Sequence, residues 1–229
     1  MTQLTKGQTI AIDGPAGAGK STVAREVARR LGYLYLDTGA MYRALTVKAL
    51  REQVGFEDEA ALTQLAARTG IDLRPETDDH GRARIFLDGE DVTRAIRTPE
   101  VNQFVSLVAK SPGVRKVLVH LQRQLAKDGR VVVEGRDIAS NVLPGADCKI
   151  FLTASLEVRA RRRLAELVAA GFGVTLEEVV EDLSVRDRMD SQREVAPLVC
   201  VESAQVVDTS DLTIDEVVDT VIRCCREKG

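Results

Sequence analysis

A nine-residue stretch, GPAGAGKST at residues 14–22, restricts the folds open to this chain more than any other part of its sequence. The short apolar run TIAID stands before it and predicts a buried strand. After it, Val23, Val27 and Leu31 recur at helical spacing. Strand, glycine-rich turn and helix in this order are the context of a P-loop, whose pattern is G-x-x-x-x-G-K-[ST]. The sequence therefore predicts an α/β fold built around a nucleoside triphosphate site.

Each residue type in the P-loop has a chemical role. The glycines allow successive backbone N–H groups to line a concavity, and the helix N-terminus adds a partial positive charge. We expect Lys20 to reach the β- and γ-phosphates of ATP and the Ser21 hydroxyl to ligate Mg²⁺. The alternative is a flexible glycine loop before an ordinary helix, which the agreement of motif and flanks disfavours. The expected ATP-binding residues are Gly14, Pro15, Ala16, Gly17, Ala18, Gly19, Lys20, Ser21 and Thr22.

Composition argues against several classes of protein. At 229 residues, the chain can form one α/β domain with insertions. It has no apolar run near the length of a membrane span, and its first residues are polar, so we expect a cytoplasmic protein with no membrane partner. A net charge of −3 and an aromatic content of 3% argue against a nucleic-acid partner.

The spacing of the four cysteines and two histidines does not indicate a metal-binding, disulfide or catalytic role. The cysteines lack a C-x-x-C pair, and no histidine lies at ligand spacing from them. We therefore predict neither a zinc site nor a disulfide framework. His80 and His120 stand alone in polar surroundings, and we expect no catalytic role for them.

The order of the predicted elements indicates a parallel sheet interrupted by one insertion. Five apolar, β-branched segments suit one parallel sheet covered by helices: residues 9–13, 33–37, 130–134, 148–152 and 204–207. Helices are expected at about 23–31, 40–53, 58–68, 100–109, 114–127, 156–192 with a break at 171–173, and 213–225, where Thr213 and Glu216 form a capping box.

Short extended pieces near 71–73, 84–87 and 90–92 do not fit the parallel pattern. Asp88-Gly89 is a strong hairpin signal between two of them, and residues 77–81 are also rich in turn formers. We therefore expect a small antiparallel sheet within an insertion over residues 58–99. Residues 1–57 and 100–229 would then form the P-loop core, with a helical lid at about 156–192.

Two of the predicted strands end in charged residues, at the edge where open α/β sheets bind ligands. Residues 130–134 lead into Glu134-Gly135-Arg136-Asp137, and residues 33–37 lead into a helix that carries Arg43 in its first turn. These groups suit an anionic second substrate, although Arg43 alone could equally be an exposed helix charge.

The chain has no guanine-reading N-K-x-D segment and no Walker B strand that ends in Asp. A small-molecule kinase is therefore favoured over a GTPase or a motor ATPase.

Arg186, Asp190 and Arg193 have the spacing of one helical face. One interpretation is a surface ladder of ion pairs. The other is an arginine-rich lid that closes over the P-loop, stabilises the charge of a migrating phosphoryl group and excludes water.

Four segments in this order and spacing, GPAGAGKST, LDTGAMYR, EGRDI and DSQREVAPL, closely resemble the bacterial cytidylate kinase family. The resemblance runs from the first strand to the last and includes the antiparallel insertion. It implies transfer of the γ-phosphoryl group of ATP to CMP or dCMP, which gives CDP or dCDP and ADP with Mg²⁺ as cofactor. It also implies direct in-line transfer without a covalent enzyme intermediate.

The resemblance implies roles for residues at matching positions. Arg43, Arg136 and Arg193 would bind the CMP phosphate, and Ser106, Arg115 and Asp137 would read the cytosine edge. Cytosine offers an amine donor beside ring-nitrogen and carbonyl acceptors, which such a set complements. The implied catalytic residues are Lys20, Arg186 and Arg193. The implied substrate-binding residues are Asp37, Thr38, Tyr42, Arg43, Ser106, Arg115, Arg136, Asp137, Arg186, Asp190 and Arg193.

Departures from the family pattern are few. Glu134 and Thr38 stand where some relatives carry Asp and Ser, and Met189 where some carry another Arg. Three alternatives remain: a kinase for a nucleoside monophosphate with another base, such as UMP; a P-loop protein that binds nucleotide without transferring phosphate; and a nucleic-acid-linked ATPase. We expect a monomer. Residue types alone do not choose among CMP, dCMP and UMP, identify which arginines in 159–163 contact ATP, or fix the extent of lid closure.

Overall fold

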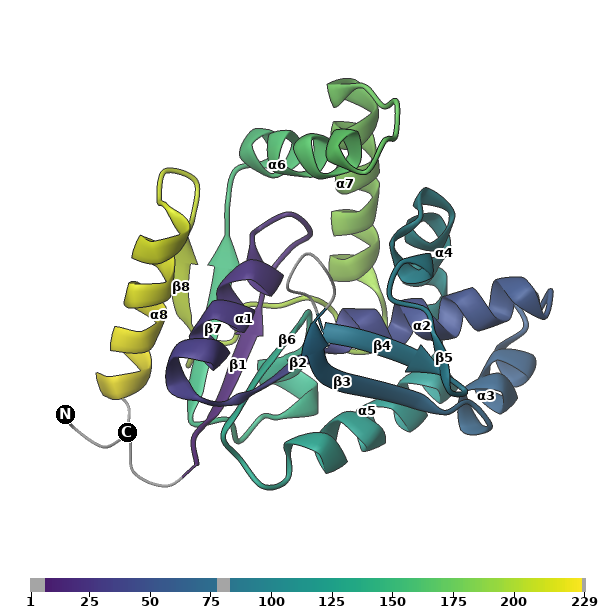
Figure 1. Cartoon of the computed structure of the whole chain (residues 1–229), viewed down its shortest axis with the longest axis horizontal. Helices are drawn as coiled ribbons and strands as arrows, with labels where there is room; N and C mark the ends of the chain where they lie inside the picture. The colour runs from purple at the N-terminus through teal and green to yellow at the C-terminus, as the bar shows by residue number, and fades with distance from the viewer. Residues whose placement is uncertain (1–6, 78–82, 228–229) are drawn as a thin grey trace. The chain divides into compact units, whose positions relative to one another are not determined.

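Five strands form one sheet in the order β2-β6-β1-β7-β8 (Figure 1). They are β1 (Thr9–Asp13), β2 (Leu34–Asp37), β6 (Val131–Gly135), β7 (Cys148–Thr153) and β8 (Gln205–Asp208). The central strand β1 pairs in parallel with β6 and β7, and β7 pairs in parallel with β8. The predicted five-stranded parallel sheet is confirmed, with shifts of single residues at some strand ends.

The computed structural model describes residues 7–77 and 83–227, and the chain divides into two compact units. The first unit is Met1–Tyr35 with Asp128–Gly229, and the second is Leu36–Lys127. Most of the turn predicted at residues 77–81, with His80, lies outside the described residues. Within the described ranges, no helix is long and apolar enough to cross a membrane.

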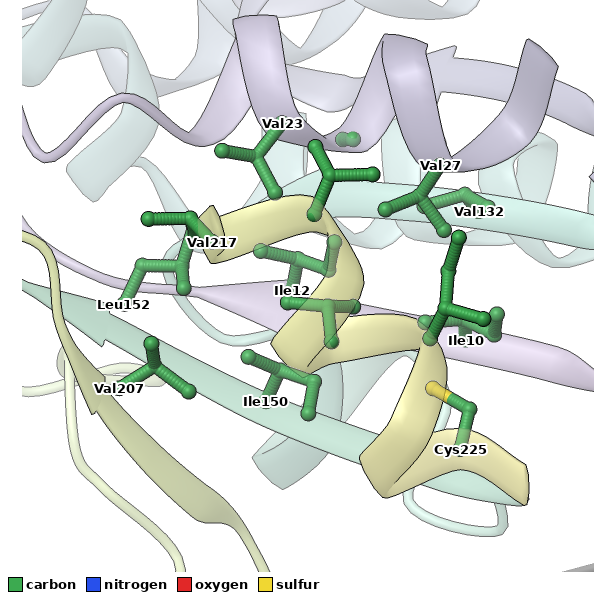
Figure 2. Close-up of a cluster of buried hydrophobic side chains, with 14 of the residues drawn as sticks. Ile10, Ile12, Val23, Val27, Val132, Ile150, Leu152, Val207, Val217 and Cys225 are labelled. Carbon is green, nitrogen blue, oxygen red and sulfur yellow. The ribbon is translucent and has the colours of Figure 1, made fainter. Parts of the chain in front are cut away.

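The core of the first unit lies between the sheet and two helices, α1 (Lys20–Leu31) and α8 (Ile214–Glu227). Figure 2 shows Val23 and Val27 of α1 and Val217 of α8 turned toward the strand residues Ile10, Ile12, Val132 and Ile150. All are buried, and burying one such side chain stabilises the fold by roughly 1.5–3 kcal/mol. This packing holds the carboxyl end of β1, and with it the start of the P-loop, in a fixed place.

A helical hairpin follows β7 in the first unit. It consists of α6 (Leu156–Ala169) and α7 (Leu176–Gln192) (Figure 1), and the break between them, residues 170–175, includes the predicted one at residues 171–173. Thr175 begins α7 with a capping box, since its hydroxyl accepts from the Glu178 amide and the Glu178 carboxylate accepts from the Thr175 amide. Ala16 of the P-loop packs with buried side chains of both helices, so the hairpin is anchored on the phosphate-binding loop.

The second unit combines helices with the small antiparallel sheet. Its elements are α2 (Thr38–Arg51), α3 (Glu59–Ala67), β3 (Ile71–Thr77), β4 (Ala83–Leu87), β5 (Glu90–Asp91), the 3₁₀ helix η1 (Ala95–Arg97), α4 (Pro99–Lys110) and α5 (Pro112–Ala126). The strands pair antiparallel in the order β3-β4-β5, as expected. Asp88 and Gly89, both at positive φ, form the predicted hairpin turn.

Helix α2 begins earlier than predicted. The sequence predicts a helix from about residue 40, but Thr38 and Gly39 are already its first residues. The reason is Asp37, whose carboxylate accepts a hydrogen bond from the amide of Ala40 at 2.9 Å and caps the helix. The cap places Asp37 and Thr38 at the point where β2 becomes α2.

The prediction that the cysteines form no disulfide is wrong. Cys148, the first residue of β7, is bonded to Cys225 near the end of α8, with their Cα atoms 5.2 Å apart. Both residues are fully buried. The two cysteines are 77 residues apart, so their spacing in the sequence gives no sign of the bond. They meet because α8 packs against β7. Cross-linking a loop of this size stabilises a fold by about 4.5 kcal/mol in the chain-entropy account.

A thiol titration tests this bond. In protein unfolded without reductant, we expect only Cys200 and Cys224 to react, because these are the free cysteines. After reduction, all four cysteines should react. The variant Cys225→Ser should expose Cys148 without reductant and so add one reactive thiol. Four reactive thiols in the unreduced wild-type protein would contradict the bond.

Candidate functional site

The loop between β1 and α1 has a backbone that only glycine tolerates at several positions. Gly14, Gly17 and Gly19 have φ values of 150°, 77° and 85°. A Cβ on Gly14 would lie 2.0 Å from the carbonyl oxygen of Leu152, and one on Gly17 would lie 3.0 Å from Cβ of Arg159. The loop is therefore packed closely against β7 and α6. The first amides of α1 follow directly, which makes this a phosphate-binding geometry.

Lys20 is buried at the start of α1, with an exposed fraction of 6%. Its Nζ donates a hydrogen bond to the carbonyl oxygen of Pro15 at 2.7 Å. Burial, and then the charge of Arg136, lower the pKa of Lys20 well below its ordinary value, while Glu134 opposes the shift. Such a perturbed lysine in a glycine-rich loop is characteristic of a functional site.

Helix α7 faces the loop after β6 through two ion pairs within the first unit. Nε of Arg136 donates to Oδ2 of Asp190 at 2.7 Å, and a terminal nitrogen of Arg193 donates to Oδ1 of Asp137 at 3.0 Å. Nε of Arg186 lies 4.0 Å from the same Asp190 oxygen. The structure thus brings together the predicted residues Lys20, Arg136, Asp137, Arg186, Asp190 and Arg193.

These pairs modify one expectation about α7. Arg193 is not on the helical face of Arg186 and Asp190, because α7 ends at Gln192 and Arg193 is its extended C-cap residue. Two of the three residues face the loop after β6 with side chains that are nearly buried, at 7% exposure each for Asp190 and Arg193. The arrangement therefore differs from a surface ladder of ion pairs.

The charges of this cluster reinforce one another. Burial opposes ionisation of Asp190, but the guanidinium groups of Arg136 and Arg186 hold the pKa of Asp190 below its ordinary value. Burial likewise opposes the charge of Arg136, and Asp190 raises its pKa. A guanidinium has five N–H donors, so a bond to one carboxylate leaves it able to bind phosphate oxygens as well.

Two arginines of α6 are linked to the P-loop backbone, Arg159 directly and Arg162 through Thr209, which residue types alone did not reveal. Arg159 donates to the carbonyl oxygen of Ala16 at 3.1 Å and to Asp187 of α7 at 2.7 Å. Arg162 donates to Thr209, whose hydroxyl in turn donates to the carbonyl oxygen of Ala18 at 3.3 Å. Their spacing of three residues places them on one helical face, but Arg163 lies four residues from Arg159, so spacing alone did not single them out.

The neighbouring arginines have a different role. Arg161 pairs with Glu157, and Arg163 pairs with Glu166, both on the surface of α6.

Glu134 is also part of the site, since it is buried at the end of β6 and accepts a hydrogen bond from the Tyr35 hydroxyl. This position agrees with the prediction that charged groups stand at the carboxyl end of this strand.

The other predicted residues belong to the second unit. The Arg115 guanidinium lies 5.8 Å from the ring centroid of Tyr42, and Arg115 donates to the carbonyl oxygen of Ala109. Nε of Arg43 on α2 is 3.5 Å from the side-chain oxygen of Asn102 on α4. Ser106 is buried on α4, and Asp37 and Thr38 begin α2. Tyr42 and Arg115 thus lie together within this unit.

Comparison with known proteins gives one consistent result. The sequence model described as cytidylate kinase matches residues 10–227. The chain is 54% identical to a cytidylate kinase from Desulforamulus reducens, over 99% of this chain and 100% of the relative. It is 48% identical to a cytidylate kinase from Bacillus subtilis, over the same shares of the two chains.

The Arg136–Asp190 pair provides a test of the cluster's stability. Asp190→Asn removes the charge that balances Arg136 and Arg186, so we expect the free energy of unfolding to fall by about 1–3 kcal/mol. Urea unfolding at neutral pH measures the change. The control is Glu157→Gln, whose pair with Arg161 has both side chains more than half exposed and should change stability by less than about 0.5 kcal/mol. Equal effects of the two substitutions would contradict a buried, mutually stabilised cluster.

Proposed function

The chain belongs to the cytidylate kinase family, and on this premise we propose that it transfers the γ-phosphoryl group of ATP to CMP, and to dCMP, forming the diphosphate and ADP. One observation supports this proposal most strongly. The first unit holds a glycine-strained P-loop with a buried Lys20, and beside it the loop after β6 carries Arg136 and Asp137 paired to α7. A donor loop and a second group of phosphate-binding side chains are what a phosphotransferase requires.

The donor, ATP, binds at residues 14–22. The amides of the loop and of the first turn of α1 surround its phosphates, and Lys20 lies against the β- and γ-phosphates. Arg159 and Arg162 support this site by holding the carbonyl groups of Ala16 and Ala18, directly and through Thr209.

Mg²⁺ accompanies ATP in this proposal. Among the described residues, no group of three His, Cys, Asp or Glu side chains could hold a metal ion. Mg²⁺ commonly retains waters and takes most other ligands from substrate phosphates, so one protein oxygen is sufficient. The Ser21 hydroxyl fits, because it is exposed at the start of α1, next to Lys20. The ion supplies charge neutralisation at the phosphate oxygens when bound.

The acceptor, CMP, is held by arginines and by groups that match cytosine. Arg43, Arg136 and Arg193 bind its phosphate, and Ser106, Arg115 and Asp137 recognise the base. Arg186 and Asp190 bind the ribose, and the resemblance to the family assigns Asp37, Thr38 and Tyr42 of the second unit to CMP binding as well. Asp137 can accept from Arg193 and from the cytosine amine together, since a carboxylate has about four lone-pair sites.

The reaction is an in-line displacement at the γ-phosphorus. A CMP phosphate oxygen attacks, and no general base is needed because this phosphate is already anionic near neutral pH. Lys20, Arg186 and Arg193 stabilise the charge that spreads over the migrating group. The α6–α7 hairpin excludes water, which would otherwise compete as acceptor.

Initial rates with a panel of acceptors test the function. With ATP and Mg²⁺, we expect CMP and dCMP to be phosphorylated fastest, UMP more slowly and AMP least, because Asp137 and Arg115 complement cytosine. A coupled assay for ADP, with each acceptor at equal concentration, measures the rates. AMP as the best acceptor would overturn the base assignment. Absence of ADP formation with every monophosphate would instead identify a nucleotide-binding protein without transfer.

A further inference from the structure

Asp13 is a buried carboxylate for which neither the P-loop motif nor the proposed function provides a role. It is the last residue of β1, directly before Gly14, and has an exposed fraction of 2%. In the parallel register of β1 and β6, it is the partner of Gly135. Asp13 therefore lies between the start of the donor loop and the start of the segment that carries Arg136 and Asp137.

The two carboxylate oxygens of Asp13 are both used by that segment. Oδ1 accepts from the amide of Ile138 at 2.8 Å, and Oδ2 accepts from the amide of Ala139 at 2.8 Å. These amides are the first two of the short π-helix η2 (Ile138–Val142), which follows Asp137 immediately. One side chain of β1 thus fixes two successive peptide units of the neighbouring loop.

The fixed segment is the one that orients the acceptor-binding side chains. Arg136 and Asp137 stand directly before the two amides and make the pairs with Asp190 and Arg193. Gly135 belongs to β6 and is held by the sheet. With the sheet on one side and Asp13 on the other, the backbone of Arg136 and Asp137 is restrained at both ends.

Only a carboxylate provides this restraint without conflict. Asparagine has the same shape, but its NH₂ group would face one of the two amide donors. Burial, which is the largest influence, and the nearby charge of Asp137 raise the pKa of Asp13 to about 6, while the two amides and Lys20 lower it. A buried carboxylate with a raised pKa destabilises a fold near neutral pH, so its presence fits a positioning role better than a stabilising one.

We infer that Asp13 is a positioning residue that holds the loop after β6 in the conformation in which Arg136 and Asp137 bind CMP. The residue joins the acceptor-binding loop to the strand that begins the donor loop. This inference rests on the proposed function.

The first test compares KM values for the two substrates in Asp13→Asn. Because the substitution disturbs the acceptor-binding loop, we expect KM for CMP to rise roughly 10- to 100-fold, as for loss of a buried charge-assisted hydrogen bond. KM for ATP should stay within about twofold of wild type. The matched control is Asp147→Asn, since the Asp147 carboxylate also accepts from a backbone amide, that of Thr9 at the opposite end of β1. It should leave both KM values unchanged.

The pH dependence separates positioning from a general structural role. We expect kcat/KM for CMP to be much higher in wild type than in Asp13→Asn at pH 7–8. The ratio of the two should fall toward one below pH 6, because a protonated Asp13 loses one acceptor as Asn does. Taking this ratio cancels the ionisation of CMP itself, and Asp137 and Lys20, the charged groups that influence Asp13, are present in both proteins.

Specific outcomes would overturn the inference. A ratio that is constant from pH 5 to 8, or equal increases of KM for CMP and ATP, would show a merely structural role. If Asp13→Asn does not fold, binding of cytidine to the wild-type enzyme tests the inference instead, because cytidine has no phosphate that titrates. Its affinity should weaken about tenfold from pH 7 to pH 5, as Asp13 becomes protonated. An unchanged affinity would reject the inference. Failure of the wild type to phosphorylate CMP would instead reject the proposed function, so the two failures are distinguishable.

Discussion

The burial of the Lys20 ammonium is the constraint on which the rest of the first unit depends. A buried cation is unfavourable unless its surroundings compensate for lost hydration. Here the carbonyl oxygen of Pro15 accepts a hydrogen bond from it, and Glu134 favours its charge while Arg136 disfavours it. The remaining compensation is what the phosphates of ATP supply in the proposed reaction. The strained glycines of the loop are required because they allow the backbone to curl around that position.

The α6–α7 hairpin depends on the same loop. Its inner face contacts the P-loop through Ala16 in the apolar cluster and through Arg159, and Arg162 is linked to the loop by Thr209. Near the Arg159–Asp187 pair, Asp190 and Arg193 at the end of α7 hold Arg136 and Asp137 after β6. A single helical hairpin therefore contacts both the P-loop and the loop after β6, to which the proposed function assigns ATP and part of CMP binding. Movement of α7 would change both sets of contacts at once, which suits a reaction that must exclude water before transfer.

Local patterns predicted the elements well, because their causes lie within a few residues. The P-loop, the five parallel strands, the Asp88-Gly89 turn and the capping box at Thr213 and Glu216 were all expected, and all are present. The residues that prediction missed act over long distances in the chain. Asp13 meets amides more than a hundred residues away, and Cys148 meets Cys225 only after the sheet and α8 have packed. Arg159 and Arg162 could be separated from their neighbours only once the inner face of α6 was known.

Replacement of Lys20 by Ala tests the central claim most directly. If Lys20 stabilises the charge of the migrating phosphoryl group, kcat for CMP phosphorylation should fall by roughly 10²- to 10³-fold, because the lost interaction is strongest in the transition state. Circular dichroism and urea unfolding should show that the variant keeps its fold, since removal of the Lys20 side chain deletes an unfavourable buried charge. A kcat within a few-fold of wild type in a folded variant would contradict the assignment of Lys20 and, with it, the account of the site.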